Sequence, residues 1–208
     1  MSKERPILFN GAMVRAILAG QKSQTRRVMK HQPQSVVVPG VGPMLAVQKA
    51  KGTDRWLWPN AREQVIAECP IGQPGDRLWV RETFSPIYSA IDGRMIEVDY
   101  RATYKNGHRM GDHLGMPKKW TPSIHMPREA CRLVLEITAV RVERLQDISG
   151  PDAVAEGIEE LNGRFTFNGG MHESLTPRLS FQTLWDSTGG DWASNPWVWV
   201  IDFKKVTP

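Results

Sequence analysis

One stretch of alternating residues constrains the fold more than any other part of this 208-residue chain. Residues 131–145, CRLVLEITAVRVERL, place Leu133 and Ile137 on one face of an extended chain and Val134 and Val140 on the other. Because both faces contain apolar residues, we expect a long strand that is covered on both sides. A strand of this length is expected to bend or to divide in two, as strands of closed sheets do.

Six further segments have the pattern of a regular element. In helix 11–20, GAMVRAILAG, the apolar residues fall on one face and Gly20 stands where a helix usually stops. Ser149 or Gly150 caps a short helix, with Pro151 in its first turn and Gly157 at its end. The remaining segments are an extended segment at 6–9, a strand at 77–84, a helix at 179–190 and a closing strand at 195–206.

Three stretches between these elements are irregular and rich in proline and glycine. They span 31–74, 85–125 and 158–177, and we interpret them as loop-rich insertions in a single domain of residues 1–208. Asp92-Gly93 is a strong turn signal and predicts a hairpin in the second insertion. Strands outnumber helices and no βαβ rhythm occurs. The sequence therefore predicts an α+β, mainly β fold, a small β-barrel with short peripheral helices.

The composition limits partners and compartment. With 27 basic and 22 acidic residues the net charge is +5, which favours polyanionic partners only mildly. The eight tryptophans suit a core but also the stacking of bases. Cys69 and Cys131 lack metal-site spacing, so we expect reduced thiols, no metal and no organic cofactor. No apolar run approaches about 18 residues and no signal segment is evident, so we expect a cytoplasmic protein without a membrane partner.

The order of four short motifs resembles a known family. GQKSQTRR at 20–27 is followed by PGDRLWVRE at 74–82, AVAEG at 153–157 and WVWVIDF at 197–203. This order is similar to that of the ASCH domain, a member of the PUA-like superfamily of RNA-binding modules and modified-base readers. The resemblance covers about half of the chain. With its insertions, the chain is most similar to the larger ASCH proteins of phage and prophage genomes.

The resemblance implies a site as well as a fold. Small bacterial N4-acetylcytidine amidohydrolases of this family carry a Lys and a Thr in a G-x-K-x-x-T segment and a Glu near the end of the later helix. The matching positions are Lys22, Thr25 and Glu156. Such a trio implies a hydroxyl nucleophile or orienting group, a lysine base whose pKa is lowered by burial, and a carboxylate that relays a proton or positions the attacking water.

Eight further residues are candidates for contact with a substrate or a nucleic acid. They are Arg26, Arg27, Trp79, Arg81, Glu82, Trp120, His125 and Arg128. Each also fits a structural role: a solvated basic turn for the first two, a cross-strand ion pair for Arg81 and Glu82, and a polar turn for His125 and Arg128.

Three functions fit these observations. The first is a binding module whose PUA-like pocket takes a nucleotide or modified base of RNA or DNA. The second is an amidohydrolase that deacylates N4-acylated cytidine or cytosine through Lys22, Thr25 and Glu156. The third is a phage accessory protein that acts through protein contacts made by its long insertions. The sequence favours the first two over the third.

Overall fold

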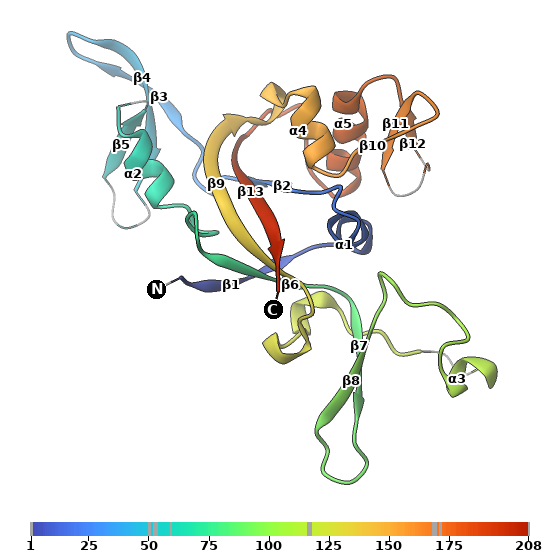
Figure 1. Ribbon diagram of the computed structural model, residues 1–208. Helices are drawn as coiled ribbons and strands as arrows, with labels where there is room; N and C mark the ends of the chain where they lie inside the picture. The colour runs from blue at the N-terminus through green and yellow to red at the C-terminus, as the bar shows by residue number, and fades with distance from the viewer. Residues whose placement is uncertain are drawn as a thin grey trace.

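A five-stranded sheet forms the centre of the molecule, in a computed structural model that describes residues 2–49, 51, 54–58, 60–115, 118–167, 170 and 172–207 (Figure 1). The strands lie in the order β1 (Glu4–Leu8), β6 (Arg77–Arg81), β9 (Val134–Arg144), β13 (Trp197–Val206) and β2 (Gln24–Val28). Strands β1 and β6 are parallel, and the other three pairs are antiparallel.

Strands β9 and β13 are the longest pair in this sheet. They match from Trp197 opposite Arg144 to Val206 opposite Val134, with a register shift between Asp202 and Phe203. Both strands curve strongly along their length (Figure 1). The long strand expected from alternation is therefore present and bends without dividing, and the closing strand pairs along its whole length.

Helix α1 (Gly11–Leu18) connects the two edge strands of the sheet. The side chain of Asn10 accepts a hydrogen bond from the backbone N–H of Met13 and so caps the helix start. Val14 and Ile17 point into the larger apolar core, which also covers Trp199 and Ile201 of β13. Gly20 adopts a φ of +76°, which suits glycine and lets the chain leave the helix toward β2.

Two helices cover the other face of β13 and β2 (Figure 1). Helix α4 (Gly150–Ala155) is capped by Ser149, as expected, and helix α5 (Pro177–Ser187) by Thr176. Phe181 and Leu184 of α5 pack with Val198 and Val200 of the sheet in a second core cluster. The sheet thus has an apolar layer on each face.

The three stretches expected to be loop-rich contain more regular structure than the sequence indicated. The first forms a sheet of β3 (Gln34–Val38), β4 (Gly42–Gln48) and β5 (Arg55–Trp58), followed by α2 (Arg62–Ala67). The second contains the expected hairpin, β7 (Phe84–Tyr88) and β8 (Met95–Tyr100), then α3 (Met110–His113) and a 3₁₀ turn at Ser123–His125, and another 3₁₀ turn follows it at Arg128–Ala130. After β9 come a 3₁₀ turn at Leu145–Asp147 and, beyond α4, a sheet of β10 (Glu159–Leu161), β11 (Arg164–Phe167) and β12 (His172–Ser174).

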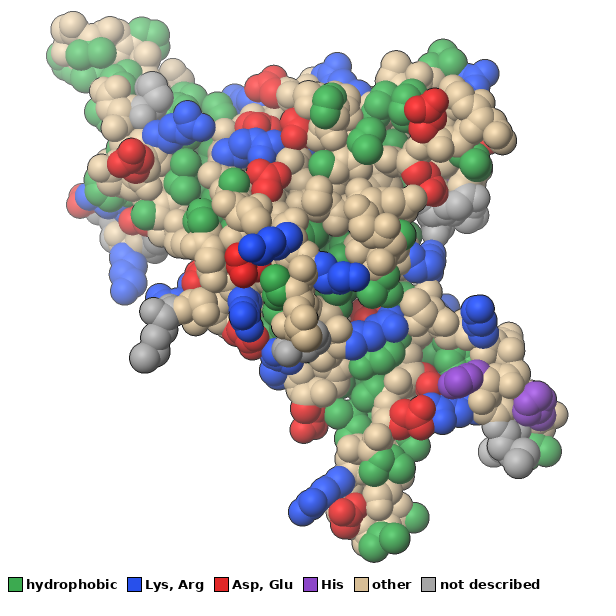
Figure 2. All heavy atoms as spheres, in the orientation of Figure 1, with side chains coloured by type: hydrophobic (Ala, Val, Ile, Leu, Met, Phe, Trp, Pro, Cys, Tyr) green, Lys and Arg blue, Asp and Glu red, His purple; other side chains and the backbone are tan. Residues whose placement is uncertain are grey.

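Hairpins β3–β4 and β7–β8 project from the body of the molecule, and hydrophobic side chains gather at both tips (Figure 2). Val37 is 80% exposed on the first hairpin and Ile91 is 97% exposed on the second. The α+β, mainly β class is confirmed. Among the described residues the central sheet is open, with β1 and β2 at its edges. None of the described helices has the length and apolar character needed to cross a membrane.

A close approach at Gly157 gives a first prediction. Gly157 has a φ of +100°, and a Cβ atom there would lie 3.3 Å from Ala16 Cβ and 3.4 Å from Lys22 Cβ. We expect Gly157→Ala to lower the free energy of unfolding by about 2–3 kcal/mol, because backbone strain and crowding add. Urea unfolding measures the change.

Gly163→Ala is the matched control, since Gly163 has a φ of +74° with open space around its Cβ position. Gly163→Ala should lower the free energy of unfolding by about 1–2 kcal/mol, from backbone strain at positive φ alone. Equal losses in the two variants would show that the contact between α1 and the end of α4 is not tight.

Candidate functional site

Lys22 and Glu156 form a buried ion pair at the end of α4. Their residues are only 3% and 4% exposed, and Lys22 Nζ donates to Glu156 Oε2 at 2.7 Å. The same ammonium donates to the backbone oxygens of Gln24 and Glu156, each at 2.8 Å. All three ammonium protons therefore have acceptors. An isolated antiparallel bridge joins the backbones of Lys22 and Glu156, so the pair is held by main chain as well as by side chains.

A second buried cation lies on the other oxygen of the same carboxylate. Arg26, 2% exposed, donates from Nη1 to Glu156 Oε1 at 3.2 Å and also to the side-chain oxygen of Gln24. Its Nη2 donates to Glu143 Oε2 at 3.2 Å. Each oxygen of Glu156 thus accepts from one cation, and the carboxylate is fixed from both sides.

The buried part continues into a partly exposed rim. Arg141 lies 2.5 Å from Glu143, 2.9 Å from Asp152 and 2.6 Å from Asp202. Gln24 Nε2 donates to Asp152 at 3.0 Å and to Asp202 at 2.6 Å. We call this set the ion-pair network: Lys22, Gln24, Arg26, Arg141, Glu143, Asp152, Glu156 and Asp202.

Strand register explains why these side chains meet. Gln24 and Arg26 alternate along β2 and therefore point to one face of the sheet. Gln24 lies opposite Asp202 of β13, and Arg26 lies opposite Val200. On the far side of β13, Val200 lies opposite Arg141 of β9. Three adjacent strands thus present polar side chains on the face that α4 covers.

Burial changes the protonation chemistry of Lys22. Desolvation lowers the pKa of Lys22, because the ammonium loses its hydration, while the Glu156 carboxylate acts in the opposite sense. The like charges of Arg27 and Arg26 lower the pKa of Lys22 further. Loss of a proton from Lys22 is therefore easier than in water, although the attraction of Glu156 limits the effect.

A cavity of about 250 Å³ is lined by residues of α1 and by Glu156 of the network. Its apolar lining residues include Ala12, Met13 and Ala16 from α1, Phe167 from β11 and Leu184 from α5. Its polar lining residues are Arg15, Gln21, Glu156 and Glu159. Glu156 belongs both to the ion-pair network and to the lining of this cavity.

Thr25 lies beside the pair but faces the other way. It is 1% exposed in β2 and lies opposite Ile201, between Gln24 and Arg26. Since neighbouring residues of a strand alternate, its side chain points to the face opposite theirs. Lys22 reaches the carbonyl that precedes Thr25, and its three protons go to other acceptors. The geometry therefore brings Lys22 and Glu156 together, while Thr25 points to the face of β2 opposite Gln24 and Arg26.

The remaining basic candidates near β2 and β6 have structural partners. Arg27 donates to the backbone oxygen of Leu8 at 2.9 Å, and its guanidinium lies 5.2 Å from the ring centre of Phe9. Arg81 donates to the backbone oxygen of Met126 at 3.1 Å and lies over the half-buried ring of Trp79 at 5.4 Å. These contacts fix the arginines to backbone and to aromatic rings.

Glu82 is 1% exposed and accepts two hydrogen bonds from Arg132, at 2.9 and 3.0 Å. Arg128 pairs with Glu4 at 2.8 Å. The ion-pair alternative for Glu82 therefore holds, but with Arg132 as its partner. Neither pair includes a residue of the ion-pair network.

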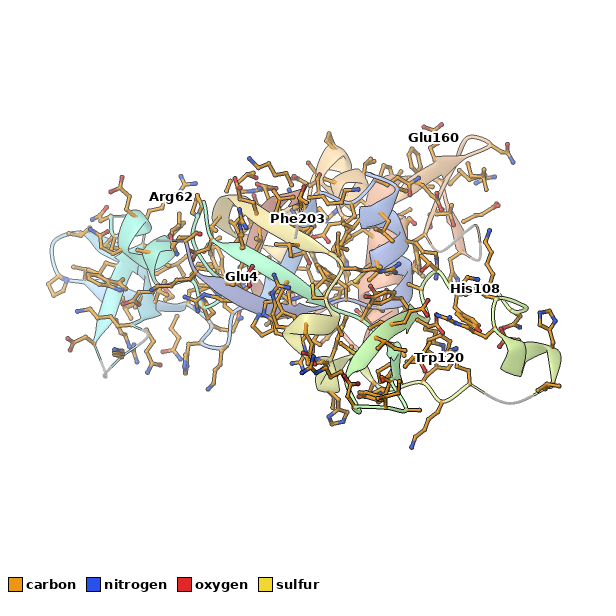
Figure 3. All side chains as sticks on the ribbon, turned by 60° about the horizontal axis from the view of Figure 1, so that its bottom comes forward. Glu4, Arg62, His108, Trp120, Glu160 and Phe203 are labelled. Carbon is orange, nitrogen blue, oxygen red and sulfur yellow. The ribbon has the colours of Figure 1, made fainter. Side chains whose placement is uncertain are left out.

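Trp120 and His125 lie in the second insertion. Trp120 meets Tyr104 edge-on at 5.3 Å, and His125 is exposed. Figure 3 shows Trp120 and His108 in this part of the molecule, apart from Glu160 of β10. Neither Trp120 nor His125 is among the residues that line the cavity beside Glu156.

Five members of the network were not expected from the sequence: Gln24, Arg141, Glu143, Asp152 and Asp202. A usable signal was present for two of them. Arg141 and Asp202 are charged residues within strands whose neighbours are apolar, and such positions require a partner inside the fold. Which partner they meet depends on pairing between distant strands.

Glu97, Asp99 and His108 bring potential ligand atoms within 4.8 Å of one another, the one such group among the described residues. Two cations already lie on these carboxylates, since Arg109 binds Asp99 at 2.9 Å and Lys118 binds it at 2.5 Å. A metal ion would have to displace them, so this group is better described as an ion-pair cluster.

Comparison of the chain with protein-family models, curated proteins and solved structures finds no match. The geometry of the site is therefore the basis on which its function is assigned.

Removing the charge of Glu156 tests the network. Glu156→Gln leaves Lys22 and Arg26 buried without their shared counter-charge, so we expect a loss of about 3–5 kcal/mol in the free energy of unfolding. Glu160→Gln, on the exposed side of β10, should change it by less than about 0.5 kcal/mol. Chemical denaturation of the two variants measures the difference.

The double variant Lys22→Met/Glu156→Gln distinguishes the interaction between the two charges from independent effects of each substitution on stability. Removing both charges should recover part of the loss, because no lysine ammonium then remains buried beside a neutral amide. Losses that simply add in the double variant would contradict the proposed coupling.

Proposed function

We propose that the protein binds a nucleobase-bearing ligand, a nucleotide or a modified base of RNA or DNA, in the cavity beside Glu156. The observation that carries this proposal is the position of the Glu156 carboxylate. It is held by Lys22 and Arg26, and Glu156 is one of four polar residues that line a cavity of about 250 Å³ together with apolar side chains. A lining that combines apolar surface with convergent polar groups is typical of small-molecule sites.

The chemistry of the cavity suits a planar heterocycle with an amino group. An ionised carboxylate has about four lone-pair sites. Lys22 and Arg26 occupy one on each oxygen, which leaves acceptor capacity for a ligand. Exocyclic amino and ring N–H groups of cytosine, adenine or guanine are the matching donors. Met13, Phe167 and Leu184 provide the apolar surface that a base ring needs.

The arrangement of the central sheet supports a PUA-like fold of the ASCH type. Helix α1 joins the two edge strands, β1 and β2, and packs Val14 and Ile17 into the core. It therefore lies where a barrel would close. The segments that carry the resemblance also meet in space, since GQKSQTRR and AVAEG contribute the two halves of the Lys22–Glu156 pair.

Two of the basic residues of KSQTRR act indirectly in this proposal. Lys22 and Arg26 are buried and neutralised by carboxylates, so they orient Glu156 and do not contact phosphate. Ligand recognition would then depend on the held carboxylate. A site of this kind discriminates by hydrogen bonding, because a ligand without the matching donor leaves a buried acceptor unpaired.

An amidohydrolase acting on N4-acylated cytidine is the second candidate. The contact of 2.7 Å between Lys22 and Glu156 and the lowered pKa of Lys22 favour it. In that reaction water adds to the acyl carbonyl, the C–N bond breaks, the nitrogen takes a proton, and the products are cytidine and a carboxylate. Lys22 would act as a base only after giving up one of its three protons, and Thr25 faces away. Binding therefore ranks first.

Filling the cavity tests the binding proposal without disturbing the charges. Ala12 lines the cavity, so Ala12→Phe should weaken the binding of cytidine or N4-acetylcytidine at least about 10-fold. Ala67→Phe on α2 is the matched control and should bind as the unmodified protein does. Calorimetric titration measures both. Equal affinity in the two variants, or no binding of any of the four common nucleosides, would rule out this cavity as the ligand site.

A hydrolysis assay separates the two candidates. We expect the unmodified protein to bind N4-acetylcytidine without releasing acetate, as followed by mass spectrometry. Turnover that is lost in Lys22→Met would instead assign the amidohydrolase activity. Thr25→Val keeps the shape of the side chain and removes its hydroxyl, so its effect on any turnover would decide whether Thr25 takes part.

A further inference from the structure

A second groove is lined by residues of the central sheet, of the small sheet β3–β4–β5 and of α2. It consists of two adjoining cavities of about 250 and 350 Å³. Lys30, His31 and Gln48 line both cavities, so the two are parts of one groove.

The larger cavity is rich in hydrogen-bond donors and positive charge. Lys30, His31, Gln34, Gln48 and Arg55 line it, together with Gln32 and Ala46, and no carboxylate does. Amide, imidazole, ammonium and guanidinium groups are the donors that bind phosphate oxygens. The composition of this end therefore suits an anion.

The cations at this end are unpaired. Within the part of the chain that the structure describes, Lys30, His31 and Arg55 make no side-chain hydrogen bond or ion pair, and all three are exposed. Some other arginines have carboxylate partners, as Arg128 has Glu4 and Arg132 has Glu82. Two unpaired cations and an imidazole around one cavity form a local positive potential that no nearby acid in the lining offsets.

The smaller cavity has the opposite character. Met29, Val47, Val65 and Trp199 line it, and Glu68 is its one acidic lining residue. An apolar ring can pack there, while Glu68 disfavours a phosphate at this end. The groove thus has a direction, with the anion at Lys30 and Arg55 and an apolar group toward Trp199.

We propose that this groove binds a phosphate-bearing ligand, with the phosphate between Lys30, His31 and Arg55 and its organic part against Met29 and Trp199. The ligand is a nucleotide or a nucleic-acid strand, which share this phosphate chemistry. The groove and the cavity beside Glu156 have no lining residue in common. The second site therefore does not depend on the proposed function of the first.

The test uses the whole chain and three phosphate probes: inorganic phosphate, adenosine 5′-monophosphate and a single-stranded oligonucleotide. In an NMR titration we expect the backbone signals of Lys30, His31, Gln48 and Arg55 to shift. Lys30→Ala/Arg55→Ala should weaken binding of the bound probe by about 10-fold or more, because charge-assisted hydrogen bonds are lost. Arg164→Ala/Lys205→Ala removes the same net charge from exposed positions elsewhere and should change the affinity less than about twofold.

The probes also distinguish the two sources of phosphate. A nucleic-acid strand gives binding that falls steeply with added salt, because several phosphates release counterions. A single nucleotide gives a shallower salt dependence. Adenosine has no phosphate, so its affinity should be the same for Lys30→Ala/Arg55→Ala and for the unmodified protein. Its binding therefore tests the cavity beside Glu156 independently of the phosphate site. Equal losses in the two double variants, or no shift at these residues with any probe, would overturn the proposal.

Discussion

The arrangement of this site depends on the ion pairs that the buried carboxylate of Glu156 makes with Lys22 and Arg26. Taking a carboxylate and two cations out of water costs several kcal/mol per ion, and only well-formed hydrogen bonds offset that cost. Here Lys22 and Arg26 supply them, one on each oxygen. Because Glu156 ends α4 while the two cations belong to the segment after α1, the same contacts fix α4 against β2. The close approach of Gly157 to α1 completes this junction.

The two faces of β2 have different roles as a consequence. One face carries Gln24 and Arg26 into the ion-pair network, and the other turns Thr25 toward the larger core. A strand cannot direct neighbouring residues to the same face. A chemistry that uses the hydroxyl of Thr25 must therefore take place on the face of β2 opposite Gln24 and Arg26. Recognition by the held carboxylate needs no such arrangement, and this difference is the physical reason for placing binding before hydrolysis.

Local patterns in the sequence predict the long elements well and the contacts between them poorly. Alternation over 131–145 predicts β9 because both faces of that strand are buried, and Ser149 predicts the start of α4 because capping is a local interaction. Strands such as β10 and β12 have three residues each, too few for an alternation to be recognised. The network depends on the register of β2, β13 and β9, which are distant in sequence. The resemblance brings Lys22 and Glu156 together, and an acid in the last turn of a helix indicates a basic partner without fixing which one.

The positive charge of the chain is divided between two kinds of cation, and net charge alone does not distinguish them. Lys22 and Arg26 are buried and paired with acids, so they fix the position of Glu156 and attract distant anions little. Lys30 and Arg55 are exposed and unmatched in the described structure, so they contribute attraction for anions. The basic segment that most resembles a nucleic-acid contact in the sequence is therefore the one least able to touch phosphate. The groove beside α2, which the sequence did not indicate, has the free charges that such a contact requires.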